Sequence, residues 1–375
     1  MFSEAIVLHL SISKLFMRFS YLIILVVLSS CFACSSNEVH LYVGTYTEGD
    51  SEGIYRVKFN TETGEFSDKL LVAKEVNPSF LALSPKKDFL YAVNEVANFN
   101  EDTSGSVVSF KVTEGGALEK LNKVSSKGAH PCHITVDESG KKIAVSNYSG
   151  GTVALYSSES GMLSEAIQVM DHNSKEEKSH VHAAQFSSGS LFVADLGRNA
   201  VYHYIQDGDN YKLNNPSIAP FTENSGPRHF ILSEDGRFIY VIHEYTNAIS
   251  VIRKTSDGFD LEEQVTTLED SFSSESFCAD IHFSKDERFV YGSNRGENTI
   301  VVFERMDEAG KLRHIQNVDV RGNWPRNFTL SPNGRFLLVA NQKSNNISTF
   351  SIDVGSGKLE FVKRVDFPSP VCLLF

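Results

Sequence analysis

One motif recurs seven times along this 375-residue chain: an apolar, strand-forming run that ends in small or polar residues. Successive copies begin about 50 residues apart, and no helical pattern separates them. The runs are LYVGTY, LYAVNE, IAVSNY, LFVADL, IYVIHE, VYGSNR and LLVANQ, beginning at Leu41, Leu90, Ile143, Leu191, Ile239, Val290 and Leu337. A repeat of this length and type is typical of a β-propeller, in which each copy supplies one blade.

Short polar turns connect these runs to the apolar strands before them, as in Ser233-Glu234-Asp235-Gly236 and Ser331-Pro332-Asn333-Gly334. Turn residues between β-branched and aromatic runs are typical of hairpins. Further apolar runs follow each copy, for example at 248–252 and 299–303. Each copy therefore supplies about four strands, the number found in a propeller blade.

The two ends of the chain together complete one copy. The first copy begins with its second strand, and residues 369–375 resemble the missing first strand when they are compared with residues 77–83. Closing a ring in this way removes exposed sheet edges. The sequence therefore predicts an all-β fold: a seven-bladed β-propeller with four antiparallel strands per blade, closed by the N- and C-terminal strands within one blade.

The N-terminus has the pattern of an export signal, because an apolar run at 21–28 follows Lys14 and Arg18 and precedes small residues and Cys31. We expect a signal peptide at 1–30, a lipidated tether at 31–38 attached to the membrane through Cys31, and a propeller at 39–375. This predicts an exported lipoprotein, periplasmic or on the cell surface. An uncleaved anchor, a start at Met17 instead of Met1, and a cytoplasmic location if the signal is not used stay open.

The net charge of −12 and the pI near 5.5 argue against a broad basic surface, so we expect no nucleic-acid partner. A small positive pocket for an anion is still compatible with this charge. Cys132, Cys278 and Cys372 lie far apart, which gives neither a disulfide framework nor zinc spacing. The sequence does not indicate an oligomeric state.

Polar side chains gather where the first strand of each copy starts and the second ends. These two points are neighbours in an antiparallel hairpin, so all copies place them on one face around the channel. Histidine, arginine and carboxylate groups from distant positions are expected there, namely His133, Asn147, His180, His182, Arg228, His229, Glu244, Asp280, His282, Arg295, Arg326 and Asn327.

Several segments resemble the lactonase-type seven-bladed propellers, a family that includes bacterial 6-phosphogluconolactonases and fungal carboxymuconate-lactonizing enzymes. The segments are LYVGTYT at 41–47, GPRH at 226–229, ADIH at 279–282, SNR at 293–295 and PRNF at 325–328. Each is weak alone, but together and in order they are specific for the family. The resemblance covers residues 40–375 and implies hydrolysis of a small, anionic lactone, with 6-phosphogluconolactone as the leading substrate.

The resemblance also implies a catalytic group of His180 or His182 with Arg228, Glu244 and Arg295. A neutral histidine would take a proton from water, the two arginines would stabilise the oxyanion and hold an anionic group, and Glu244 would orient a histidine or an arginine. No metal and no cofactor is expected. The side chains that we expect to contact substrate are His133, Asn147, His229, Asp280, His282, Arg326 and Asn327.

Other interpretations stay open. His133 and His282 also fit core positions, and Asn147, with Asn94, Asn294 and Asn341, also fits a structural role at turns. A metal-assisted lactonase and a non-enzymatic binding propeller are alternatives, because a fold does not decide a function. Export also conflicts with a phosphorylated sugar as substrate, since sugar-phosphate metabolism is cytoplasmic.

Overall fold

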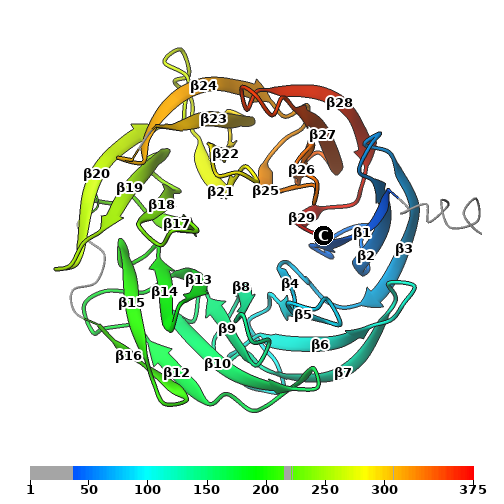
Figure 1. Ribbon diagram of the computed structural model, residues 1–375. Helices are drawn as coiled ribbons and strands as arrows, with labels where there is room; N and C mark the ends of the chain where they lie inside the picture. Colours follow the sequence, from blue (N-terminus) through cyan, green and yellow to red (C-terminus); the bar gives the residue numbers. More distant parts are fainter. Residues whose placement is uncertain (1–36, 215–220, 222, 307) are drawn as a thin grey trace, which may run out of the picture. The chain divides into compact units, whose positions relative to one another are not determined.

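The computed structural model describes residues 37–214, 221, 223–306 and 308–375. Within Glu38–Phe375, which is one compact unit, seven antiparallel sheets stand around a central axis (Figure 1). The described residues contain strands and turns but no helix. The predicted seven-bladed propeller is therefore confirmed. The predicted signal peptide at 1–30 and Cys31 lie outside the described residues.

The blades are numbered here in chain order, and each is given from its innermost strand outwards. Blades 1 and 2 contain β29 (Pro370–Leu374), β1 (Glu38–Thr45), β2 (Gly53–Asn60) and β3 (Phe66–Lys74), then β4 (Leu81–Leu83), β5 (Phe89–Asn94), β6 (Ser106–Val112) and β7 (Leu118–Ser125). Blades 3 and 4 contain β8 (Pro131–Val136), β9 (Lys142–Asn147), β10 (Thr152–Glu159), β11 (Met162–Leu163) and β12 (Gln168–Asp171), then β13 (Val181–Ser187), β14 (Ser190–Asp195), β15 (Ala200–Asp207) and β16 (Asn210–Leu213).

The same order holds in the last three blades. Blade 5 contains β17 (Pro227–Leu232), β18 (Phe238–His243), β19 (Ala248–Lys254) and β20 (Phe259–Thr266). Blades 6 and 7 contain β21 (Phe277–Phe283), β22 (Phe289–Arg295), β23 (Thr299–Met306) and β24 (Lys311–Asp319), then β25 (Pro325–Leu330), β26 (Phe336–Asn341), β27 (Asn346–Ile352) and β28 (Leu359–Asp366).

The ring closes in blade 1, where the C-terminal β29 pairs antiparallel with β1. Tyr42 lies opposite Leu374 and Val43 opposite Leu373. This closure confirms the prediction made from residues 369–375. It also pairs the inner edge of β1, as the innermost strand does for the second strand of every other blade.

The second strands are apolar on both faces because each blade is sandwiched between two others. In β18 every residue from Phe238 to His243 is buried. Leu41 and Val43 of β1 pack with Leu338 of β26, so a core cluster joins blades 1 and 7. Burial of both faces explains why these strands read as nearly continuous apolar runs, whereas the outermost β28 is mostly exposed.

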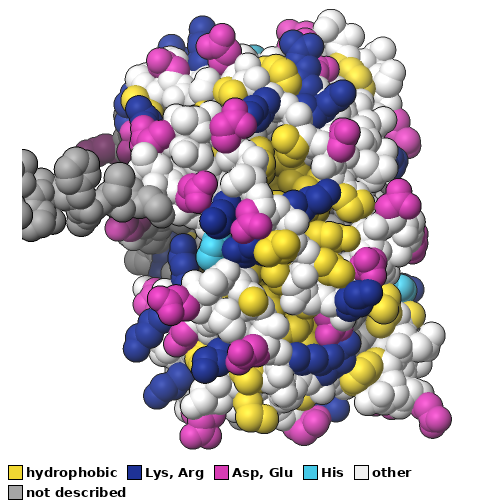
Figure 2. All heavy atoms as spheres, turned by 90° about the vertical axis from the view of Figure 1, so that its right-hand side faces the viewer, with side chains coloured by type: hydrophobic (Ala, Val, Ile, Leu, Met, Phe, Trp, Pro, Cys, Tyr) yellow, Lys and Arg dark blue, Asp and Glu magenta, His cyan; other side chains and the backbone are white. Residues whose placement is uncertain are grey.

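The face of the molecule that Figure 2 shows mixes charges of both signs. Figure 2 shows lysine, arginine and acidic side chains intermingled around a band of apolar ones. Exposed apolar side chains on the outermost strands of blades 1 and 7 include Leu70, Phe361 and Val362. No continuous basic surface appears on this face, in keeping with the acidic composition.

Candidate active site

Four of the innermost strands carry the same register shift near their start, and three of the residues at the shift are predicted site residues. In β17 the pairing with β18 jumps between Pro227 and His229, which leaves Arg228 without an opposite partner. The same shift isolates Cys132 in β8, His182 in β13 and Arg326 in β25. A β-bulge bends a strand and redirects a side chain. The bulges therefore give three of the predicted site residues, Arg228, His182 and Arg326, equivalent positions in their blades.

Two buried arginines share one carboxylate in the candidate site. Arg228 Nε and Arg295 Nη2 each lie 3.0 Å from Oε2 of Glu244. Arg228 and Arg295 are only 2% and 4% exposed. The backbone of Glu244 is held from both sides, because its N–H donates to Gly226 O at 2.7 Å and its carbonyl accepts from Cys278 N at 3.2 Å. The three side chains that the resemblance implied thus lie together, contributed by blades 5 and 6.

Backbone carbonyls of blade 6 hold the two guanidinium groups. Arg228 Nη1 donates to Ala279 O at 2.5 Å, and Arg295 Nη2 donates to Cys278 O at 2.8 Å. Burial pushes the pKa of Glu244 upward, but the charges of Arg295 and Arg228 outweigh burial and hold that pKa below its usual value. Glu244 is therefore ionised at neutral pH and ties the arginines together.

Beside the arginines, aromatic rings from four blades meet near the axis. His229 lies 5.2 Å from His182, 5.5 Å from His133 and 5.9 Å from Phe80, measured between ring centroids. Phe80 in turn lies 4.3 Å from His133. Burial, followed by neighbouring positive charge, holds the pKa of His133 and of His182 well below the usual histidine value. The rings form a neutral layer next to the charged groups.

Asp280 organises the polar side of this layer. Its Oδ1 accepts from His229 Nδ1 at 2.8 Å, and its Oδ2 accepts from His282 Nε2 at 3.1 Å and from Asn327 Nδ2 at 2.6 Å. Burial would raise the pKa of Asp280, but the two histidines outweigh burial and hold the pKa well below its usual value. Asp280 therefore acts as a buried acceptor, and His229 carries its proton on Nδ1.

Asn327 also bonds to the closing strand, because its Oδ1 accepts from Leu373 N at 2.7 Å. His282 is half-buried and its ring lies 4.8 Å from the ring of Phe328. These contacts make His282 and Asn327 the outer members of the Asp280 network, which spans blades 5, 6 and 7.

The two candidate general bases have different environments. His180 is half-buried, stacks on Tyr148 at 4.5 Å, and has its Nδ1 3.1 Å from the Tyr148 carbonyl. A carbonyl only accepts, so Nδ1 carries the proton and Nε2 keeps its lone pair. His182 is only 5% exposed, and its Nδ1 is buried without a hydrogen-bond partner among the described residues.

The remaining expected substrate contacts differ in kind. Asn147 is fully buried, and its Nδ2 donates to Ser126 O at 2.8 Å. The equivalent amides of Asn94 and Asn294 bond to Val76 O and Thr267 O in the same way. This recurrence favours the structural interpretation of these asparagines. Each one hydrogen-bonds the end of a second strand to the connecting segment that leads into the same blade from the preceding blade.

The predicted site residues leave out three side chains that border the site. Tyr148 supports His180, and Tyr46 packs against Arg326 with its ring 5.3 Å from the guanidinium carbon. The Tyr46 hydroxyl donates to Glu95 Oε2 at 2.9 Å. All three directly follow the end of a second strand, as Glu244 does. That shared position was the available signal.

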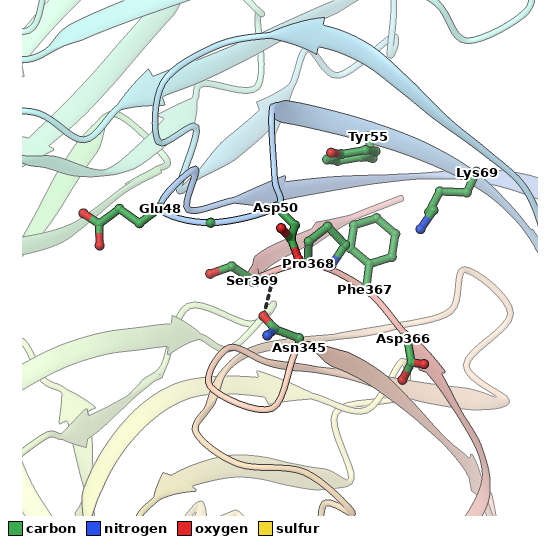
Figure 3. A pocket seen from close by; sticks show the side chains of 10 residues that line it. Glu48, Asp50, Tyr55, Lys69, Asn345, Asp366, Phe367, Pro368 and Ser369 are labelled. Carbon is green, nitrogen blue, oxygen red and sulfur yellow. Dashed lines mark hydrogen bonds between the residues drawn. The ribbon is translucent and has the colours of Figure 1, made fainter.

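A pocket of about 500 Å³ lies elsewhere, at the seam between blades 1 and 7 (Figure 3). We call it the seam pocket. Its lining consists of Glu48, Gly49, Asp50, Tyr55, Lys69, Asn345, Asp366, Phe367, Pro368 and Ser369. None of the side chains predicted for the site lines it. Among the residues that the structure describes, no group of three or more histidine, cysteine or acidic side chains is arranged to hold a metal, and no helix could span a membrane.

Comparison with known proteins shows the family to which the chain belongs. Residues 40–375 match the model of the family described as lactonase, 7-bladed β-propeller. The chain is 33% identical to the 6-phosphogluconolactonase of Bacillus subtilis over 89% of this chain and 97% of that protein. It is also 33% identical to the 6-phosphogluconolactonase of Formosa agariphila, over 85% of this chain and 94% of that protein.

Solved structures agree. A periplasmic gluconolactonase of Pseudomonas aeruginosa has a TM-score of 0.83 at 32% identity, with 89% of this chain and 98% of that chain covered. The fold and the matched family define a propeller enzyme that hydrolyses a small-molecule lactone. The chain belongs to the seven-bladed lactonase family.

Proposed function

We propose that this protein hydrolyses a sugar lactone without a metal ion, with His180 as general base and Arg228, Glu244 and Arg295 as the electrostatic part of the site. The observation that carries the choice of base is the contact of His180 Nδ1 with the Tyr148 carbonyl. This contact leaves Nε2 free to accept a proton, on a side chain that is only half-buried. His182 has a pKa well below the usual value because of burial and of the arginines, which makes it a weaker base.

The proposed reaction uses these groups in the following way. Water attacks the lactone carbonyl carbon as its proton passes to His180 Nε2, and negative charge develops on the carbonyl oxygen. The buried guanidinium groups of Arg228 and Arg295 stabilise that charge, because electrostatic interactions are stronger away from bulk water. The ring C–O bond then breaks, the alkoxide takes the proton back from His180, and the product is an open-chain hydroxy acid.

Two relatives are named as 6-phosphogluconolactonases, and a third is named as a gluconolactonase. We therefore propose an aldonolactone as substrate. The Pseudomonas relative is named as a periplasmic enzyme, which supports our proposal that this chain is also exported and anchored through Cys31. Incorporation of labelled palmitate that survives Cys31→Ala would contradict the anchor.

The function is tested with the purified protein and a panel of phosphorylated and unphosphorylated aldonolactones. We expect hydrolysis of at least one of them that persists after chelation. His180→Ala should lower kcat by about 10²- to 10⁴-fold, the usual contribution of a general base. His182→Asn is the matched comparison and should lower kcat less. The assignment fails if His182→Asn has the larger effect, and the proposed function fails if the wild-type protein hydrolyses no lactone in the panel.

A further inference from the structure

Asp195 occupies a position at which four other blades carry a neutral asparagine. It is the last residue of β14, it lies opposite the first residue of β15, and it is fully buried. The residues at the same point of the other four blades are Asn94, Asn147, Asn294 and Asn341. Burying a carboxylate in place of an amide is costly unless hydrogen bonds replace the lost water. The carboxylate therefore serves a purpose that the four amides do not.

Four donors surround the carboxylate of Asp195. Its Oδ1 accepts from the backbone N–H groups of His180 at 2.9 Å and Arg198 at 3.0 Å. Its Oδ2 accepts from Ser179 Oγ at 2.5 Å and from His172 Nδ1 at 3.1 Å. Burial would raise the pKa of Asp195, but three of these hydrogen bonds, the one from His172 foremost, outweigh burial and hold that pKa below its usual value. An amide has a single acceptor oxygen and could not serve four donors in this way.

Behind this carboxylate, His172 continues a buried chain of polar groups. It directly follows β12, and its side chain is only 3% exposed. Because its Nδ1 donates to Asp195, the Nε2 of the neutral ring is an acceptor, and it lies 2.7 Å from the Tyr204 hydroxyl. Burial raises the pKa of Tyr204, so this hydroxyl stays protonated and can donate to Nε2. The three side chains therefore form an ordered chain of hydrogen bonds that ends at the backbone of His180.

His180 is anchored differently from the equivalent residue of five other blades. These counterparts each precede a proline, and they are Asn77, His130, Gly226, Trp324 and Ser369. Each has a left-handed φ between 39° and 69°, and each donates its N–H to the loop between the second and third strands of the preceding blade. His180 precedes Val181, has no such φ, and donates its N–H to Asp195 of its own blade. The backbone of His180 therefore takes its position from Asp195 and not from the preceding blade.

We propose that Asp195, supported by His172, is a positioning residue that places His180 for proton transfer. This inference rests on the proposed function, because it takes His180 as the general base. The ring of His180 is directed by the Tyr148 carbonyl and its backbone by Asp195, so both parts of the residue are held. A general base must lie within hydrogen-bond reach of the water that it deprotonates, so even a small displacement slows the reaction. Asp195 acts only through His180, since a fully buried carboxylate does not contact substrate.

The first test measures kcat and KM for lactone hydrolysis in the full chain, with circular dichroism to show that each variant is folded. Asp195→Ala should lower kcat by about 10- to 100-fold and leave KM nearly unchanged, because it displaces the base and not the groups that hold the substrate. Asp195→Asn should recover part of the loss, since its one acceptor oxygen can still face the N–H of His180.

Asn341→Ala is the matched control in blade 7. It removes the side chain at the same position, where Nδ2 donates to Ser348 Oγ at 3.0 Å and no candidate base is nearby in the chain. This variant should lose stability but keep the wild-type kcat. A loss of kcat equal to that of Asp195→Ala would mean that both residues act only by supporting the fold, which would overturn the inference.

A double-mutant cycle separates positioning of the base from general damage to the fold. In the His180→Ala background, Asp195→Ala should cause no further loss of kcat, because the side chain that it positions is gone. The inference is wrong if Asp195→Ala leaves the kcat of the wild type unchanged, or if it lowers kcat by the same factor in both backgrounds. Should Asp195→Ala not fold, the same cycle with Asp195→Asn decides: kcat must fall by about threefold or more with His180 present and stay constant without it.

The same measurements distinguish failure of this inference from failure of the proposed function. Wild-type protein that hydrolyses no lactone overturns the proposed function and, with it, the role of Asp195. Wild-type activity that survives His180→Ala overturns the choice of base. Activity that depends on His180 but not on Asp195 overturns the positioning role alone.

Discussion

The candidate site and the seam pocket place charged side chains in opposite ways. At the site, Arg228 and Arg295 are almost fully buried, and each is bonded to a backbone carbonyl of a neighbouring strand. At the seam, Asp50, Lys69 and Asp366 are exposed to solvent around a hollow of about 500 Å³ (Figure 3). Exposed charges are screened by water, whereas buried and fixed ones act strongly on a reacting group. An open volume alone therefore does not identify the reactive part of this propeller.

If the buried charges drive the reaction, replacement of Arg228 should lower activity more than any other substitution considered below. Arg228→Ala should lower kcat/KM by about 10²- to 10³-fold, the usual cost of losing a group that stabilises an oxyanion. Arg228→Lys should recover only part of this, because an ammonium group cannot reproduce the contacts to Glu244 and Ala279. Lactone hydrolysis and the circular-dichroism spectrum are measured together. A folded Arg228→Ala variant within tenfold of the wild type would contradict the assignment.

The histidine layer at the site predicts a loss of stability in acid. Burial, and then Arg228, lower the pKa of His229 from 6.5 to about 4. Between these two pKa values the histidine is protonated in the unfolded chain but not in the folded protein. The free energy of unfolding therefore falls as the pH falls. The loss from His229 is about 3 kcal/mol once the pH reaches about 4. His133 and His182 act in the same direction.

Urea unfolding between pH 7.5 and pH 4.5 measures this prediction. His229→Gln removes the titrating group, and its free energy of unfolding should depend less on pH than that of the wild type, whatever its absolute stability. Equal pH dependence in the two proteins would show that His229 does not resist protonation in the fold.

The fold could be predicted from the sequence because its information is repeated. Each blade restates the same strand and turn pattern, and residues 369–375 supply the one strand missing at the start. The pairing of side chains across blades could not be predicted in this way. The bond between His229 and Asp280, or the contact of Arg326 with Tyr46, depends on how neighbouring blades are tilted and spaced. No local pattern encodes that geometry.

The choice between His180, which directly precedes β13, and His182, which lies within it, shows the same limit. Residues two apart point to the same face of an extended chain, so sequence alone treats the two histidines as equivalent. The bulge between Val181 and Ala183 breaks this equivalence. It leaves His182 among buried rings, whereas His180 remains half-buried against Tyr148.

A substitution at Gly197, beside the candidate site, should lower activity less than the loss of Arg228. A Cβ atom at this position would lie 2.7 Å from Lys178 O and 2.8 Å from His180 N, both backbone atoms. Gly197→Ala should therefore displace His180 and lower kcat/KM by about tenfold, since small misplacements of catalytic groups are costly. Gly115→Ala is the matched control, because a Cβ there meets nothing within 4 Å. An unchanged rate in Gly197→Ala would count against His180 as the base.

Substitutions at the seam pocket should have the smallest effect. Lys69→Gln and Asp366→Asn alter exposed charges that line this hollow but touch none of the candidate site residues. We expect kcat/KM to stay within about twofold of the wild type, because screened surface charges contribute little beyond the Debye length. The two variants and Arg228→Ala are assayed with one lactone. A tenfold loss at the seam would mean that substrate binds between blades 1 and 7, and that the buried arginines serve the fold instead of the reaction.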